Sequence, residues 1–147
     1  MTESKIDEQR KILEKLGNEL TRIQFDFKIK ENSSEKYWKK RIEEFKTYHK
    51  KTIEYFLQGY KLIKTTDAET AGLFVLRLSK LKELGTKLIE NMENVRQNPS
   101  VMDLKNRQQS KWSTEQREHL INSNKECLNH EKKMNVFFRE FFEKNQK

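Results

Sequence analysis

The sequence contains very few residues that break or cross-link secondary structure: one proline, four glycines and one cysteine in 147 residues. Because so few turns can be made, the elements must be few and long, and an all-β fold is nearly excluded. The single cysteine, Cys127, excludes an internal disulfide and is typical of a reducing compartment. No stretch approaches the roughly 20 apolar residues of a membrane-spanning helix, and the N-terminus lacks the apolar core of a signal peptide. We therefore expect a soluble, intracellular protein of the cytoplasm.

Only 33% of the residues are hydrophobic and 37% are charged, a balance typical of disorder when the apolar residues are scattered. Here they are not scattered, because they recur at three- and four-residue steps, the spacing of one face of an α-helix. The first two stripes are Ile6, Leu13, Leu16, Leu20, Ile23 and Phe27, then Trp38, Ile42, Phe45, His49, Ile53, Phe56, Tyr60 and Ile63. The other two are Phe74, Leu78, Leu81, Gly85, Leu88, Met92 and Val95, then Leu120, Ser123, Cys127, His130, Met134, Phe137 and Phe141.

These stripes predict four helices, over residues 4–31, 34–64, 67–97 and 114–144, joined by one long connection over 98–113. The third stripe keeps the strict four-three spacing of a coiled coil. Each of the last three segments is about 30 residues long, which makes a helix of about 45 Å. Matched lengths and short first and second connections predict one domain, residues 1–147, folded as an all-α four-helix bundle of antiparallel helices.

The stretch RIQFDFKIKENSSEKYWKK, residues 22–40, does not fit one pattern. Ile23, Phe25, Phe27 and Ile29 alternate with polar residues, which is the period-two pattern of a half-buried strand. A lone strand among helices would leave its backbone groups unpaired, unless it paired with its own copy in a dimer. We therefore expect a helix whose second apolar side, formed by Phe25 and Ile29, still needs cover from the 98–113 connection or from a partner.

No enzyme signature is present: the chain has no P-loop, dinucleotide-binding, nucleophile-elbow or HExxH motif. None of the three histidines has a glutamate three residues before it, as a di-iron bundle requires. His49, Cys127 and His130 lie on core stripes at mid-helix levels and could bind zinc, or could be ordinary core residues with polar neighbours. Since they come from only two helices and form no motif, we expect no metal, no cofactor and no catalytic residue.

The net charge of +8 is concentrated in residues 33–66, which carry nine positive and four negative charges. This surface would attract phosphates of nucleic acid, an acidic membrane or an acidic protein, or it is a solvated face that keeps the chain in solution. The sequence KKR followed by KK adds the nucleus as an alternative location. The candidate anion-binding residues are Lys36, Lys39, Lys40, Arg41, Lys46, Lys50 and Lys51.

Two classes of function follow. The first is a non-enzymatic adaptor or regulator that acts through protein–protein interaction, with another protein or a second copy as its partner. Its expected partner-binding residues are Phe25, Ile29, Val101, Met102 and Leu104. The second is a binder of anionic surfaces, either nucleic acid or acidic membrane, through the basic second helix. Neither class needs a small-molecule substrate.

Overall fold

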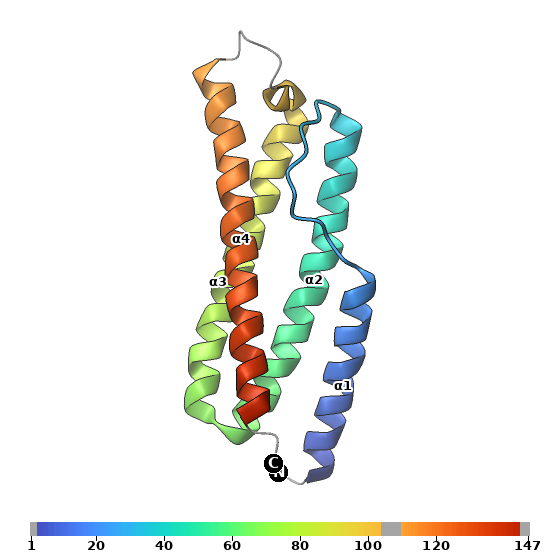
Figure 1. Ribbon diagram of the computed structural model, residues 1–147, viewed down its shortest axis with the longest axis vertical. Helices are drawn as coiled ribbons and strands as arrows, with labels where there is room; N and C mark the ends of the chain where they lie inside the picture. Colours follow the sequence, from blue (N-terminus) through green and yellow to red (C-terminus); the bar gives the residue numbers. More distant parts are fainter. Residues whose placement is uncertain (1–2, 104–109, 145–147) are drawn as a thin grey trace.

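The computed structural model describes residues 3–103 and 110–144, and within these ranges the chain forms four α-helices, one short 3-10 helix and no strand. The helices are α1 (Glu3–Arg22), α2 (Glu35–Thr66), α3 (Ala68–Gln97) and α4 (Lys111–Lys144), and η1 spans Pro99–Met102. Successive helices run up and down one long axis (Figure 1). The predicted all-α bundle, with a long connection between its third and fourth helices, is confirmed.

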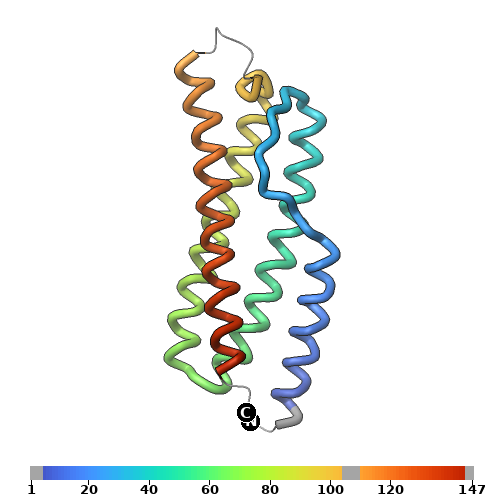
Figure 2. The backbone as a smooth tube through the Cα atoms, viewed as in Figure 1, coloured from blue at the N-terminus to red at the C-terminus, as the bar shows by residue number. Residues whose placement is uncertain are grey.

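Helices α2, α3 and α4 supply the core, and α1 packs mainly on α2. Figure 2 shows α1 beside the lower half of α2, while the residues that follow α1 run along the upper half. The second, third and fourth predicted stripes do face this core. Their buried members are Trp38, Ile42, Phe45, Phe56, Ile63, Phe74, Leu78, Leu81, Gly85, Leu88, Met92, Val95, Leu120, Ser123, Cys127 and Met134.

A single residue, Asp67, joins α2 to α3. Its backbone N–H donates to the carbonyl of Ile63 and closes α2, while its carboxylate accepts from the backbone N–H of Thr70 and opens α3. The Thr70 hydrogen bonds hold the pKa of the Asp67 carboxyl below its ordinary value. This double cap leaves no room for a loop, and the two helices therefore form a tight antiparallel hairpin.

The prediction of a helix reaching residue 31 is wrong, because α1 ends at Arg22 and residues 23–34 are not helical. This extended segment alternates as the period-two pattern indicated: Phe25, Phe27 and Ile29 are half-buried against the core, and the residues between them are exposed. The first connection is therefore also long. Because this segment is not a helix, the expectation that Phe25 and Ile29 point away from the core is also wrong.

Side chains from two helices take the place of the missing strand partner. The guanidinium of Arg41 donates from Nη2 to the carbonyl oxygens of Asp26 (2.8 Å) and Lys28 (2.7 Å). Asn124 of α4 donates to the carbonyl of Phe27 at 2.6 Å, and the indole of Trp38 donates to that of Asn32 at 2.7 Å. Side-chain donors of neighbouring helices therefore satisfy backbone carbonyls that were expected to stay unpaired in an isolated extended segment.

Candidate functional site

The predicted partner-binding residues are not gathered on a free surface. The ring of Phe25 packs 5.2 Å from that of Phe45, and Ile29 also packs against the core. Val101 and Met102 lie in η1 and are buried, with exposed fractions of 1% and 2%. Leu104 lies outside the described residues. Their role in binding a partner stays a prediction, but its premise of an uncovered second helix face is wrong.

The predicted anion-binding residues divide into two groups. Arg41 is buried, where it holds the extended segment and lies 4.6 Å from the centre of the Phe25 ring. Lys51 forms ion pairs with Glu19 of α1 (3.3 Å) and Glu54 (3.4 Å), and these two carboxylates raise the pKa of its ammonium group. The other predicted residues are exposed on α2, and anion binding by them stays a prediction: Lys36, Lys39, Lys40, Lys46 and Lys50.

A groove of about 950 Å³ lies between α1 and α4, with α2 beneath it, and sequence reasoning missed it. Its walls are polar. The lining residues from the α1 wall are Arg10, Glu14, Asn18 and Thr21, and those from the α4 wall are Asn135, Arg139 and Glu143. Because polar flanks gain little from burial against each other, α1 settles on α2 and leaves this space beside α4.

The floor of the groove is apolar and largely aromatic. It is formed by Leu13 and Gly17 of α1, Tyr55 of α2, and Phe138 and Phe142 of α4. The Phe138 ring centre lies 5.3 Å from that of Tyr55 and 4.5 Å from that of Phe142. A Cβ at Gly17 would stand 3.2 Å from the Tyr55 ring, so the glycine permits the close approach of α1 to this ring. Burial raises the pKa of the Tyr55 hydroxyl.

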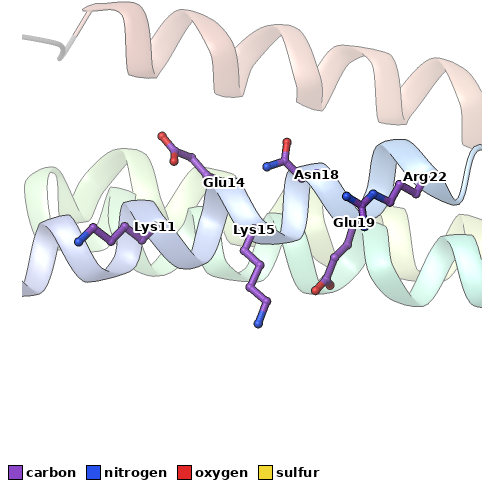
Figure 3. Close-up of a pocket in the computed structure, with 6 residues that line it drawn as sticks. All are labelled: Lys11, Glu14, Lys15, Asn18, Glu19 and Arg22. Atoms are coloured by element: carbon purple, nitrogen blue, oxygen red, sulfur yellow. The ribbon is translucent and has the colours of Figure 1, made fainter.

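A smaller hollow of about 480 Å³ is lined by residues of α1 alone: Lys11, Glu14, Lys15, Asn18, Glu19 and Arg22. In Figure 3 these side chains leave the helix in different directions, with Glu14 and Asn18 toward α4 and Lys15 and Glu19 away from it. A single helix cannot surround a ligand, and Glu19 is already paired with Lys51. We therefore regard this hollow as a charged helix surface.

The histidines and cysteine considered for zinc do not come together. The imidazole of His49 stacks on Phe45, and burial lowers its pKa. His130 lies 2.8 Å through Nε2 from the carbonyl of Arg77, and Cys127 is buried one turn before Glu131. Among residues 3–103 and 110–144, no three histidine, cysteine or acidic side chains are grouped closely enough to hold a metal ion.

A buried carboxyl lies in the middle of the bundle. Glu131 is 6% exposed, accepts a hydrogen bond from the Tyr48 hydroxyl, and its second oxygen finds no partner among the described residues. Burial raises the pKa of Glu131, and the bond from Tyr48 offsets part of this rise. Burial and the nearby carboxyl together raise the pKa of the Cys127 thiol to about 12.

We expect Glu131→Gln to stabilise the protein at neutral pH by about 1 to 2 kcal/mol. The folded-state pKa is raised above the unfolded value, so stability from this group is greatest in acid and is lost as pH rises through the folded pKa. The amide keeps an acceptor for Tyr48 and carries no charge to bury. Urea unfolding at neutral pH and near pH 4 measures the difference, which should shrink in acid. Glu126→Gln, at an exposed site on the same helix, is the control and should change little at either pH.

Comparison with known protein families, with characterised proteins and with solved structures finds no significant match to this chain. Within the described residues, no helix combines the length and the apolar character needed to cross a lipid bilayer. The groove between α1 and α4 therefore has to be interpreted from its own chemistry.

Proposed function

We propose that this chain is a non-enzymatic adaptor or regulator that binds a helix of another protein in the groove between α1 and α4. The observation that carries the proposal is the combination of polar walls with an aromatic floor in one open groove. Helices that dock into grooves place apolar anchors one turn apart on the floor and keep their polar flanks beside the rims. The groove offers both kinds of contact.

The walls favour an amphipathic helix over a lipid chain or a small apolar molecule. Each wall carries one arginine and one glutamate: Arg10 and Glu14 on α1, and Arg139 and Glu143 on α4. A fatty acid needs apolar walls and one basic end, whereas a peptide helix can carry charges of both signs along its flanks. The lining of α1 from residue 10 to residue 21 is about 17 Å long, which accommodates about three helical turns.

The contact can be tested by a photo-crosslinking amino acid placed at Asn18 in the α1 wall, with Ser79 on the exposed side of α3 as the control position. In cells that naturally make the protein, we expect Asn18 to capture one defined protein segment with helical apolar spacing, and Ser79 not to capture it. A synthetic peptide of that segment then gives the affinity directly.

Blocking the groove supplies the second measurement. Asn18→Trp and Asn135→Trp place a large ring in the groove from opposite walls, and Ser79→Trp is the matched control. Each groove variant should weaken peptide binding by at least about tenfold, because filling the groove excludes the anchors, while the melting temperature stays unchanged. Equal capture at Asn18 and Ser79, or unchanged affinity in both groove variants, would overturn the proposal.

A further inference from the structure

Five exposed lysines in the N-terminal half of α2 form a surface that the groove does not use. We call Lys36, Lys39, Lys40, Lys46 and Lys50 the lysine stripe. At 100° per residue they fall within an arc of about 120° on the helix, and they extend over about 21 Å along its axis. Glu43 lies within the same arc, so the stripe keeps an excess of four positive charges.

The charge of the lysine stripe is not balanced by its own chain. None of its five ammonium groups forms an ion pair with another described residue, in contrast to Lys51 and Arg96, which each pair with two glutamates. Lys36, Lys39 and Lys40 also lie within the first two turns of α2, which begins at Glu35. The helix dipole disfavours positive charge there, so a bound anion would offset the unfavourable electrostatic energy of these lysines.

We propose that the lysine stripe binds the surface of an anionic lipid membrane. The gaps along the stripe are three, one, six and four residues, and lipid headgroups can diffuse to meet such uneven spacing, whereas the phosphates of a duplex are fixed. Beyond Lys50 the same side of α2 continues with Glu54, whose charge is paired with Lys51, and then with Leu57. Leu57 is 38% exposed and offers an apolar contact that a bilayer accepts. A nucleic-acid backbone gains nothing from a leucine.

This surface is separate from the groove. Tyr55, which α2 contributes to the groove floor, lies about 120° around the helix from the middle of the stripe. A membrane under the lysine stripe would therefore leave the groove open to a partner. The membrane proposal stands without the groove proposal, because it uses none of the same side chains.

The test is co-sedimentation of the full chain with vesicles of phosphatidylcholine alone or of phosphatidylcholine with phosphatidylserine, at low and at physiological salt. The stripe variant replaces Lys39, Lys40, Lys46 and Lys50 by Gln. The control variant removes the same charge elsewhere by replacing four of the exposed lysines of α1 and α3, namely Lys11, Lys15, Lys80 and Lys87, by Gln. Circular dichroism melting confirms that both variants fold.

We expect binding only to vesicles that contain phosphatidylserine, and weaker binding as salt rises. Each lysine close to such a surface strengthens binding about fivefold, so the stripe variant should lose at least about 50-fold, and the control variant much less. Equal losses in the two variants would show that net charge alone attracts the protein, and would overturn the proposal. The absence of vesicle binding would also overturn the proposal. The same holds if the protein binds duplex DNA through the lysine stripe at physiological salt but no longer binds vesicles there.

Discussion

Gly59→Ala is expected to destabilise the protein by about 2 to 3 kcal/mol, although alanine is the better helix former. A Cβ at Gly59 would overlap Cε2 of the Phe138 ring, closer than any real contact between two carbon atoms. The Phe138 ring packs against Tyr55, Phe56, Phe74 and Phe142, so a shift toward the groove to make room for the Cβ would cost it contacts with these rings. Thermal and urea unfolding measure the loss, and a protein of this size should melt several degrees lower.

Gly72→Ala is the matched control, since no atom lies within 4 Å of a Cβ at that helical position. It should stabilise the protein by about 0.5 to 1 kcal/mol through helix propensity alone. Phe138→Leu introduced into the Gly59→Ala protein should recover part of the loss, because the smaller side chain makes room. If the two alanine variants changed stability equally, α2 and α4 would not approach each other at Gly59 as the structure shows.

Arg41→Ala is expected to cost about 2 to 3 kcal/mol and to release the extended segment. The substitution removes two charge-assisted hydrogen bonds to the backbone of Asp26 and Lys28, together with the stacking of the guanidinium on Phe25. Urea unfolding measures the first effect. Limited proteolysis measures the second, with faster cleavage expected within residues 23–34.

Lys40→Ala is the control for charge removal, because Lys40 is the exposed neighbour of Arg41 and should change stability by no more than about 0.5 kcal/mol. Arg41→Lys should recover only part of the loss, since an ammonium group lacks the planar guanidinium face that stacks on the Phe25 ring. Arg41→Ala behaving like Lys40→Ala in both assays would contradict the assignment of Arg41 as the residue that holds this segment.

The buried position of Arg41 also reduces the number of positive charges that the basic region can offer to a partner. The sequence KYWKKRIEEFKTYHKK contains seven cationic side chains, and the sequence alone does not distinguish which of them can bind an external anion. In the fold, Arg41 points inward and Lys51 ties α2 to Glu19 of α1, so these two charges stabilise the chain itself. Only the exposed remainder is available to an external anion, and the vesicle experiment is designed around that remainder.

The groove residues also divide into those that the sequence indicates and those that only the fold brings together. In the sequence, Phe138 and Phe142 directly follow Phe137 and Phe141 of the fourth predicted stripe, and Gly17 lies between Leu16 and Leu20 of the first. Arg10, Glu14, Asn18 and Thr21 also recur at helical spacing, which could have signalled a polar flank. Nothing in the sequence, however, indicated that α1 would settle on α2 and leave this flank facing α4 across an open space.

The sequence by itself determined α2, α3, α4 and most of the core, because helical periodicity, caps and the single proline act over a few residues. Tertiary structure decided the course of residues 23–34. The alternation of apolar and polar residues could be seen in the sequence. The side chains that donate to the backbone of this segment are distant in the chain, however: Arg41 is 15 residues from Asp26, and Asn124 is 97 residues from Phe27. An extended segment inside a helical bundle is stable only where side chains from other elements donate hydrogen bonds to its backbone. The local sequence pattern does not indicate which distant residues will pack there.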